Sequence, residues 1–369
     1  MTALARLRLT DFRNYAALDL KLDGRHVCLY GENGAGKTNI LEAISQLGPG
    51  RGLRSAALGD MTRADAPGGW TVAAELDDRR LGVSLERAGA GGKRVIRLDG
   101  APASAADLAE LVRIIWLTPA MDRIFAGGAG DRRRFFDRQV LAHVPSHGRA
   151  SAAYEAAMRE RNALLEQGRF DPAWADAIEA RMAEAGAQIA AARARVLSAL
   201  QAAVDARPEG AFPKGDLTLV GDVDSLAERG ADLVEIERML TENLRAGRRR
   251  DAAAGRTLTG PHRADLAVIH RPSGAPAAQC STGQQKALLI GLILASAQAL
   301  SEGDKGPSPL LLLDEAAAHL DSNRRAALFD ELSALPGQAW LTGTEAFLFE
   351  AFGDRAQRVE VDEGTARPV

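Results

Sequence analysis

The sequence predicts an α/β fold, with a mixed sheet core that has an antiparallel part and with a helical lobe inserted between its two halves. Three observations predict it. A short apolar run, His26 to Tyr30, leads directly into a glycine-rich loop and then a helical pattern. Near the other end of the chain, four leucines at 310–313 are typical of a strand buried on both faces of a parallel sheet. Between these segments, residues 151–207 are rich in Ala, Arg and Glu.

The composition excludes several classes of protein. The chain has 369 residues, enough for about two domains, and a formal net charge of -3, so that any contact with nucleic acid must come from local basic patches. Two cysteines, Cys28 and Cys280, form neither a disulfide framework nor a metal site. The N-terminus lacks the apolar stretch of a secretory signal, and the apolar stretch Ala287 to Leu300 is too short to span a bilayer. We therefore expect a soluble cytoplasmic protein in which 287–300 is a core helix.

The N-terminal part is expected to combine short strands with one helix. Apolar residues alternate from Leu4 to Leu22 around the polar segment Asp11 to Asn14, which predicts two strands joined by a turn. A connection rich in glycine and arginine follows at 48–54. Further short strands are expected at 70–76, 81–85 and 95–98, before a break at Pro119.

The segment Gly31 to Thr38 fits the spacing G-x-x-x-x-G-K-[ST] of a phosphate-binding loop, with the strand before it and the helix after it that this motif requires. Its glycines let successive N–H groups point inward, and the helix N-terminus adds partial positive charge, so that the main chain can hold a polyphosphate. Lys37 would reach the β- and γ-phosphates, and the Thr38 hydroxyl would ligate Mg²⁺. The alternative is a glycine-rich turn with an unrelated lysine, which the flanking elements disfavour.

The middle of the chain predicts a short helical hairpin, with Gly168 and Pro172 between two helical stretches. In the second stretch, apolar residues recur at steps of four and three over about four heptads. These residues, which we call the seam, are Ile178, Met182, Ala185, Ile189, Ala192, Val196, Ala199 and Ala203. The seam indicates either packing on the rest of the domain or a surface for a partner, and the sequence leaves both open.

From Leu258 onward the pattern returns to α/β. Strands are expected at 266–270, 310–313 and 339–342, and helices after Ser281 and from 322 to 332. We therefore expect three segments. Residues 1–122 carry the phosphate loop, residues 123–257 form the helical insertion, and residues 258–369 complete the domain that the first segment begins.

Two carboxylates follow the four leucines. Asp314, at the tip of the expected strand, can hold the Mg²⁺ shell, as the second acid of phosphate-loop NTPases does. Glu315 can orient or deprotonate the attacking water. Alone this string is weak evidence, but together with a phosphate loop in the same chain it indicates nucleotide hydrolysis, with Lys37 and Glu315 as catalytic residues.

The segment Cys280-Ser281-Thr282-Gly283-Gln284-Gln285-Lys286 precedes an expected helix. Ser281 and Thr282 are good helix-entry residues, so one interpretation is an N-cap. A serine and a glycine at a helix N-terminus also form an anion site. Because the chain already has one complete phosphate cradle, such a site would make sense if it closed over the nucleotide of a second copy.

The order of these motifs resembles that of ATP-binding-cassette (ABC) ATPases. It runs from the phosphate loop through Ser281 to Gln285 and the acidic strand to Ala318-His319-Leu320-Asp321. More narrowly, the chain resembles the RecF family of bacterial recombinational repair proteins, which is related to the heads of SMC proteins. The stretches that carry this resemblance span the chain nearly end to end: Phe12 to Tyr15, Gly31 to Ala43, Trp116 to Pro119, Gly130 to Phe135, Leu258 to Arg263, Cys280 to Lys286, Leu310 to Asp321 and Thr342 to Thr344.

This resemblance implies a P-loop NTPase fold of the ABC/SMC-head type and a head-to-tail dimer held together by two ATP molecules with Mg²⁺. The implied ATP-binding residues of one protomer are Arg13, Asn14, Gly31, Glu32, Asn33, Gly34, Ala35, Gly36, Lys37, Thr38 and Asn39. The signature residues Ser281, Thr282, Gly283 and Gln284 would cap the nucleotide of the other protomer, and Asp321 would lie near the opposing phosphate loop. The metal-binding residues would be Thr38 and Asp314.

The resemblance also implies a cellular role. The family prefers gapped DNA or single-strand/double-strand junctions and acts with RecR and RecO in loading RecA onto damaged DNA, which connects it to DNA replication, repair, recombination and SOS induction.

This sequence departs from transporter-type cassettes at two positions. Those proteins carry a Gln where the two lobes join and a His after the last strand, whereas the corresponding regions here are Thr118-Pro119 and Thr342-Gly343-Thr344. Both suit the RecF family and imply slow ATP turnover, and they leave open which residue senses the γ-phosphate. Gln284 stands where RecF signatures more usually have Glu, and Glu345 stands in place of Asp.

Two arginine clusters are the candidate DNA contacts. Six arginines lie between 123 and 149 against two aspartates, and five lie between 245 and 256 against one. Bare charge runs are more often solvated surface, but the resemblance favours DNA binding. Aromatic residues make up 5% of the chain and are not interleaved with the clusters, so no stacking platform is indicated. The candidates are Arg132, Arg133, Arg134, Arg248, Arg249 and Arg250.

Three other functions compete with an ATP-gated DNA clamp. A transporter motor subunit would need the Gln and His described above and a coupling surface for membrane partners. An SMC-like chromosome-organising ATPase would need arms longer than this hairpin. A small-molecule kinase would not need a signature at Ser281.

Overall fold

The computed structural model describes residues 2–88, 91–168, 171–302, 306–318 and 320–369. The chain divides into two compact units, which we describe separately. Unit 1 comprises 1–122, 208–212 and 289–369, and unit 2 comprises 123–207 and 213–288. The sequence-based boundary at 257/258 differs from this division. Residues 258–288 pack with unit 2 because β10 (Asp265–His270) pairs along its length with β9 (Gly215–Val220).

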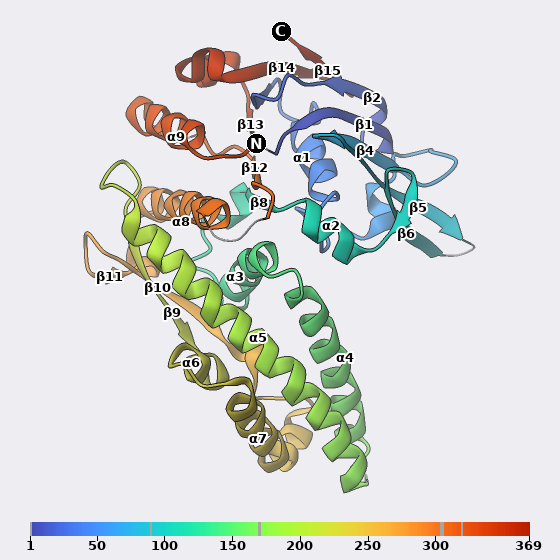
Figure 1. Ribbon diagram of the computed structural model, residues 1–369, viewed down its shortest axis with the longest axis vertical. Coiled ribbons are helices and arrows are strands. Elements are labelled where there is room, and N and C mark those ends of the chain that lie inside the picture. The colour runs from blue at the N-terminus through green and yellow to red at the C-terminus, as the bar shows by residue number, and fades with distance from the viewer. Residues whose placement is uncertain (1, 89–90, 169–170, 303–305, 319) are drawn as a thin grey trace. The chain divides into compact units, whose positions relative to one another are not determined.

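Unit 1 contains a largely parallel sheet in the order β15-β14-β3-β13-β12-β8. Every residue of β8, β12 and β13 is buried, as expected for strands covered on both faces. β3 comes from the N-terminal half of the chain but pairs with both β13 and β14, two later strands that are labelled in Figure 1. The strands are β3 (His26–Tyr30), β8 (Ile114–Leu117), β12 (Leu310–Leu313), β13 (Ala339–Gly343), β14 (Ala356–Asp362) and β15 (Thr365–Pro368).

The second sheet of unit 1 is antiparallel and has the order β2-β1-β4-β5-β6-β7. In β1 and β2 buried and accessible residues alternate, which confirms the predicted strand, turn and strand with one covered face each. The strands are β1 (Leu4–Phe12), β2 (Tyr15–Lys21), β4 (Thr71–Leu76), β5 (Arg79–Ala88), β6 (Gly91–Leu98) and β7 (Ala101–Ala103).

The core of unit 1 joins both sheets through the helix that follows the phosphate loop. One continuous cluster of buried side chains includes Leu7 and Val72 of the antiparallel sheet, Ile40 and Ile44 of α1, and Leu312 of β12. The helices of this unit are α1 (Lys37–Ser45), α2 (Ala105–Leu111), α9 (Ser322–Ala334) and the later part of α8 (Thr282–Glu302).

The C-terminal end of α1 is fixed by an arginine from the antiparallel sheet. Arg94 of β6 donates hydrogen bonds to the carbonyl oxygens of Gln46, Gly48 and Gly50 at 2.6 to 3.0 Å. A cation at this end of a helix interacts favourably with the helix dipole. Burial lowers the pKa of the Arg94 guanidinium. The two sheets therefore position α1, and with it the phosphate loop, from both sides.

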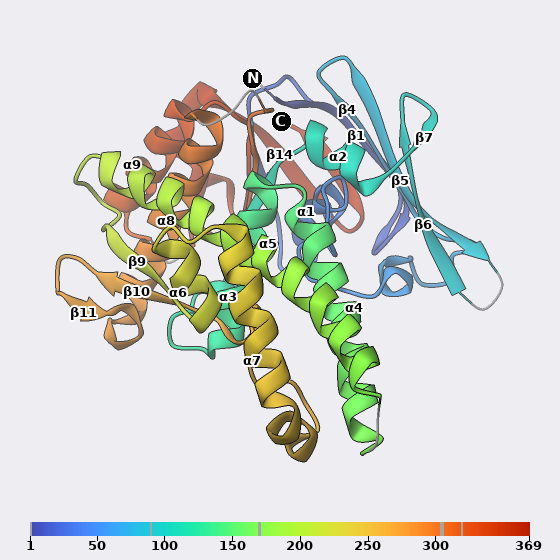
Figure 2. The ribbon, with the colours of Figure 1, turned by 60° about the horizontal axis from the view of Figure 1, so that its bottom comes forward.

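Unit 2 is built on three long helices, α4, α5 and α7; α4 and α7 are clearest in Figure 2 and α5 in Figure 1. Gly186 of α5 permits a close approach, because a Cβ atom there would lie 2.4 Å from Cδ2 of Leu240 on α7 and 3.4 Å from Cε2 of Tyr154 on α4. The elements of this unit, besides β9 and β10, are α3 (Ala129–His143), α4 (His147–Glu166), α5 (Pro172–Ala206), α6 (Asp222–Glu228), α7 (Leu233–Ala254), β11 (Ala275–Pro276) and the first turns of α8.

The seam lies on α5 and packs mainly within unit 2. Ile178, Met182, Ala185 and Ile189 belong to a buried cluster with side chains of α4, α6 and α7. Val196 and Ala203 are also buried, whereas Ala199 is exposed. The helical hairpin predicted for this region is confirmed, and its apolar face supports the packing interpretation rather than a partner surface.

Two buried arginines tie unit 2 together. Arg161 is fully buried and bonds Glu179 Oε1 at 2.9 Å and Asp251 Oδ2 at 2.8 Å. Arg193 bonds Asp137 at 2.7 Å and Asp224 at 2.8 Å. Each guanidinium thus has two carboxylate partners, as a buried cation requires.

Arg193 and Tyr154 contact the segment Leu258 to Arg263, which the resemblance to RecF proteins singled out without assigning it a role. Arg193 donates to the carbonyl oxygen of Pro261 at 2.9 Å, and Tyr154 OH lies 2.8 Å from His262 Nδ1. Burial lowers the pKa of His262 and so favours the neutral imidazole. In this structure the segment connects α7 to β10 and is held by hydrogen bonds to Arg193 and Tyr154.

The apolar stretch 287–300 forms most of α8 and is almost entirely buried, which confirms the predicted core helix. Among the described helices, none has both the length and the hydrophobicity required to cross a bilayer.

Candidate functional site

The phosphate-loop segment connects β3 to α1, as its spacing predicts. Gly31 and Gly36 have φ angles of 149° and 117°. A Cβ atom at Gly31 would lie 2.1 Å from Val361 O, and one at Gly36 would lie 2.5 Å from Asn14 Nδ2. Both positions therefore require glycine, for conformation and for space. The loop leads into the helix N-terminus, where backbone N–H groups can receive phosphate oxygens.

Lys37 lies along the phosphate loop. Its Nζ donates to the carbonyl oxygens of Gly31 and Glu32, both at 2.7 Å, and its side chain is buried. Burial lowers the pKa of this ammonium, while the nearby carboxylates of Glu315 and Asp314 act in the opposite direction. The structure therefore places Lys37 close enough to Asp314 and Glu315 for their charges to affect its pKa.

Thr38 and Asp314 meet at the start of α1. The Thr38 hydroxyl donates to Asp314 Oδ1 at 2.9 Å, and the Asp314 amide donates to Leu117 O of the adjacent strand at the same distance. A hydroxyl and a carboxylate are oxygen ligands of the kind that Mg²⁺ prefers. These residues therefore fit the predicted Mg²⁺ site.

Arg13 is held by a carboxylate that the sequence did not single out. Its guanidinium makes two hydrogen bonds to Glu42 of α1, at 2.8 and 2.7 Å, and a third to Asp60 O at 2.7 Å. Arg54 NH1 also bonds Glu42 Oε2, at 2.9 Å, and Asn39 Oδ1, at 2.8 Å. Glu42 is 1% exposed, so one buried carboxylate holds two arginines beside the loop. The only signal in the sequence was a charged residue on the buried face of α1.

Asn14 supports the phosphate loop directly. Its Nδ2 donates to Ala35 O at 3.0 Å, and its Oδ1 accepts from Asn39 Nδ2 at 2.8 Å. The next residue, Tyr15, donates from its hydroxyl to Gly36 O at 3.2 Å. The turn between β1 and β2 therefore lies against the loop, and the expected role of Asn14 in ATP binding stays a prediction.

The signature segment belongs to unit 2, where it begins α8. Ser281 Oγ accepts from the Gln284 amide at 3.3 Å, and Gln284 Oε1 accepts from the Ser281 amide at 3.0 Å. This reciprocal pair is a capping box. All four residues from Ser281 to Gln284 are exposed. A Cβ atom built on Gly283 would have no other atom within 4 Å. The N-cap interpretation is confirmed, and the helix start remains open to a ligand.

Asp321 begins α9. Its Oδ1 accepts from the Arg324 amide at 2.9 Å, which makes it the N-cap of that helix, and its side chain is 61% exposed. His319, which precedes it in the resembling stretch, lies outside the described residues.

Two of the candidate DNA-contacting arginines are engaged inside unit 2. Arg132 of α3 makes two hydrogen bonds to Asp265, at 2.8 and 2.7 Å. Arg248 of α7 bonds Glu179 Oε1 at 3.0 Å and also pairs with Asp176. Bidentate arginine pairs of this kind are among the stronger ion pairs, so these two side chains contribute mainly to the structure of the unit.

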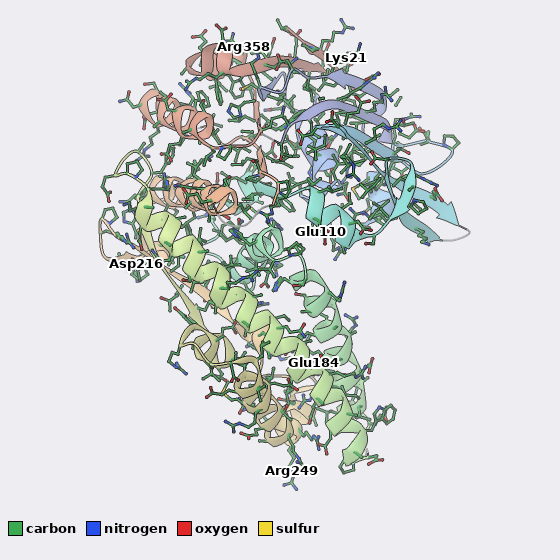
Figure 3. The ribbon with its side chains drawn as sticks, in the orientation of Figure 1. Lys21, Glu110, Glu184, Asp216, Arg249 and Arg358 are labelled. Carbon is green, nitrogen blue, oxygen red and sulfur yellow. The ribbon has the colours of Figure 1, made fainter. Side chains whose placement is uncertain are left out.

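The other four candidates differ in exposure. Arg133 is half-buried, whereas Arg134 and Arg250 are 68% and 62% exposed. Arg249 is exposed and projects from the far end of α7 (Figure 3). Of the six candidates, Arg134, Arg249 and Arg250 are therefore the exposed ones, although Arg134 also pairs with Asp131 and Arg250 donates to Thr259.

Comparison with known proteins identifies the family. The model of the RecF/RecN/SMC N terminal domain matches residues 3–361. The DNA replication and repair protein RecF of Rhizobium etli (strain CIAT 652) is 51% identical over 368 residues, covering 98% of both chains. The chain belongs to the RecF family of DNA replication and repair proteins. The RecF protein of Brucella suis biovar 1 (strain 1330) is 53% identical over 368 residues, which are 98% of this chain and 95% of that protein.

Solved structures show the same fold. The recombination mediator protein RecF of the RecFOR pathway, solved with ATPrS, has a TM-score of 0.85 and 21% identity, and the match covers 100% of this chain and 98% of that one. The Smc head domain from Pyrococcus furiosus has a TM-score of 0.54 and 15% identity, over 100% and 96% of the two chains. The RecF fold is thus the ABC/SMC-head type of ATP-binding domain that the sequence predicted.

Proposed function

We propose that this protein is an ATP-dependent, dimerising DNA-binding ATPase of the RecF family. Its substrate would be gapped or single-strand/double-strand junction DNA in the cytoplasm. There it would promote RecA loading with RecO and RecR and so contribute to SOS induction.

The observation that carries this proposal is the contact between the phosphate loop and the acidic strand. Thr38 Oγ1 and Asp314 Oδ1 lie 2.9 Å apart. The negative charges of Glu315 and Asp314 both act to raise the pKa of Lys37. A phosphate cradle, a metal-ligand pair and a water-activating carboxylate are the parts that ATP hydrolysis requires.

Thr38 and Asp314 would hold the Mg²⁺ ion. Bound Mg²⁺ would neutralise charge on the β- and γ-phosphates. The residues of the chain would have roles distinct from that of the metal. The loop amides would bind the phosphates, Lys37 would contact the β- and γ-phosphates, and Glu315 would accept a proton from the attacking water.

The exposed start of α8 at Ser281 to Gln284 supports the proposed dimer, because the chain already has a phosphate loop of its own. Ser281 to Gln284 would close over the nucleotide of a second copy, and Asp321 would lie near the opposing loop. Because such a contact depends on the γ-phosphate, slow hydrolysis would limit how long the protein stays on DNA.

Sedimentation velocity with ATP, ADP and no nucleotide, each with and without gapped DNA, tests the proposal. We expect a dimer only with ATP. Lys37→Met should abolish it, and Ser281→Arg should bind ATP but remain monomeric. A parent chain that stays monomeric with ATP bound, or a Ser281→Arg variant that dimerises normally, would overturn the proposal.

The hydrolysis step has its own test. Glu315→Gln should bind ATP and form a long-lived dimer, because the amide cannot accept the proton from water. Unchanged phosphate release by this variant would remove Glu315 from the water-activating role.

A further inference from the structure

Thr342 links the two acidic residues through a single hydroxyl. It lies in β13 and is 1% exposed. Its Oγ1 donates to Asp314 Oδ1 at 2.8 Å and accepts from the Glu315 amide, also at 2.8 Å. A hydroxyl has one donor and two acceptor sites, so both bonds can form together. The parallel register of Leu313 with Leu341 brings Thr342 to this position, one residue beyond the paired strand ends.

Asp314 is oriented by two hydroxyls. Thr38 and Thr342 both donate to the same oxygen, Oδ1, at 2.9 and 2.8 Å. One donor comes from α1 and the other from the neighbouring strand, so the carboxylate is fixed from two directions. Such outer partners of a ligating carboxylate set its orientation and tune metal affinity.

Glu315 has an unusual backbone conformation. Its φ is 50°, in the left-handed region that residues other than glycine rarely adopt. The bond from its amide to Thr342 Oγ1 holds the chain at this bend, where β12 has ended and the turn to 318 begins. The direction in which the Glu315 side chain leaves the backbone therefore depends on Thr342. Observed strain of this kind is common at functional sites.

We propose that Thr342 is a positioning residue for the proposed ATP hydrolysis. Its hydroxyl fixes the carboxylate of Asp314 for the metal and holds the backbone of Glu315 so that its side chain is presented in one orientation. Thr342 does not itself touch the nucleotide. This inference rests on the proposed function, and it assigns a role to the first residue of Thr342-Gly343-Thr344, the segment that departs from transporter-type cassettes.

Two substitutions separate positioning from packing. Thr342→Val keeps the shape and removes the hydroxyl, whereas Thr342→Ser keeps the hydroxyl and removes a methyl group. For Thr342→Val we expect metal-free ATP binding at the parent affinity, but affinity for Mn²⁺ in the presence of ATP lower by about 10-fold, measured from the electron paramagnetic resonance signal of free Mn²⁺. We expect kcat to fall by about 10-fold to 100-fold with KM for ATP nearly unchanged. Thr342→Ser should restore both quantities.

The outcomes are distinct. Parent Mn²⁺ affinity and kcat in Thr342→Val would overturn the inference, as would a Thr342→Ser variant as impaired as Thr342→Val. If Thr342→Val does not fold, Thr342→Cys takes its place in the same measurements, because a thiol is a weak donor and acceptor. Failure of the proposed function would instead appear in the parent chain, as absent ATP-dependent dimerisation, while the Mn²⁺ measurement would still report on Thr342.

Discussion

The Thr38 hydroxyl donates a hydrogen bond to Asp314 Oδ1 at 2.9 Å, although the two residues are 276 positions apart in the sequence. α1 places the hydroxyl in its first turn, and β12 places the carboxylate at its carboxyl end. The site is therefore complete only when both ends of the chain have joined one sheet.

Asp314→Asn should separate metal chemistry from folding. The amide oxygen can still accept from Thr38 and Thr342, so we expect an unchanged fold by circular dichroism. Loss of the charge should lower Mg²⁺-dependent phosphate release by at least about 100-fold. Phosphate release at the parent rate would exclude Asp314 from the metal site.

Glu42→Gln should destabilise unit 1, because it removes the charge that holds Arg13 and Arg54. We expect a loss of about 2 kcal/mol in the free energy of unfolding, measured by urea denaturation. Glu75→Gln is the matched control. Glu75 is 41% exposed and lies 4.0 Å from Arg6, so its loss should cost less than about 1 kcal/mol. Equal effects of the two substitutions would contradict the role assigned to Glu42.

Arg161→Met should destabilise unit 2 by about 3 to 5 kcal/mol, because it removes the buried cation between Glu179 and Asp251 and leaves Glu179 with Arg248 alone. Arg159→Met on the same helix is the control. Arg159 is 71% exposed and lies 4.0 Å from Glu155, so the expected loss is under about 0.5 kcal/mol. Chemical denaturation of both variants checks the difference, and a similar midpoint for the two would refute it.

His26 should make the protein less stable in mild acid. Burial lowers the pKa of its imidazole to about 4, and Arg355 acts in the same direction. Its Nδ1 accepts from the Ala339 amide at 3.0 Å and must be unprotonated to do so. Between the unfolded pKa of 6.5 and about 4, the unfolded chain binds a proton that the folded chain does not. The contribution of the neutral His26 to the free energy of unfolding is therefore fully present above pH 6.5. It is lost as the pH falls from 6.5 towards 4, by up to about 1.4 kcal/mol per pH unit.

Urea denaturation between neutral pH and pH 5 measures the effect. His26→Asn keeps an acceptor in a similar place and does not titrate, so its unfolding free energy should depend less steeply on pH. The same pH dependence in both proteins would rule out His26 as the source.

DNA affinity should fall steeply with salt if the exposed arginines contact phosphates. Arg249→Gln should reduce the slope of log affinity against log salt concentration by about 1. Arg159→Gln, outside both clusters, should leave the slope unchanged. Fluorescence anisotropy with gapped DNA checks both, and an unchanged slope in Arg249→Gln would remove this residue from the interface.

The parts of the fold that could be predicted were those whose signal is local. The phosphate loop carries its own strand and helix, and the four leucines of β12 carry the pattern of a strand buried on both faces. α7 was overlooked although Ile236, Leu240 and Leu244 recur at helical spacing, because its arginines were interpreted only as a charge cluster. The seam could not be assigned from sequence, since an apolar stripe is the same whichever helix covers it.

The site was predicted less completely than the fold. Lys37 and Thr38 could be named as candidates from motif spacing and Asp314 from the apolar strand before it, and the structure brings the three together. Glu42 and Thr342 were not, because their partners are set by contacts between elements distant in the chain. Arg13 illustrates the difference, since it was expected to bind ATP, which stays a prediction, whereas its pairing with Glu42 was not foreseen.

The position of β3 has a consequence for synthesis. Both of its neighbours, β13 and β14, are translated near the end of the chain. A ribosome working at its usual pace makes the intervening residues over tens of seconds, during which β3 has neither of its partner strands. The nascent chain should therefore be unable to complete the sheet beside the phosphate loop until translation is almost finished.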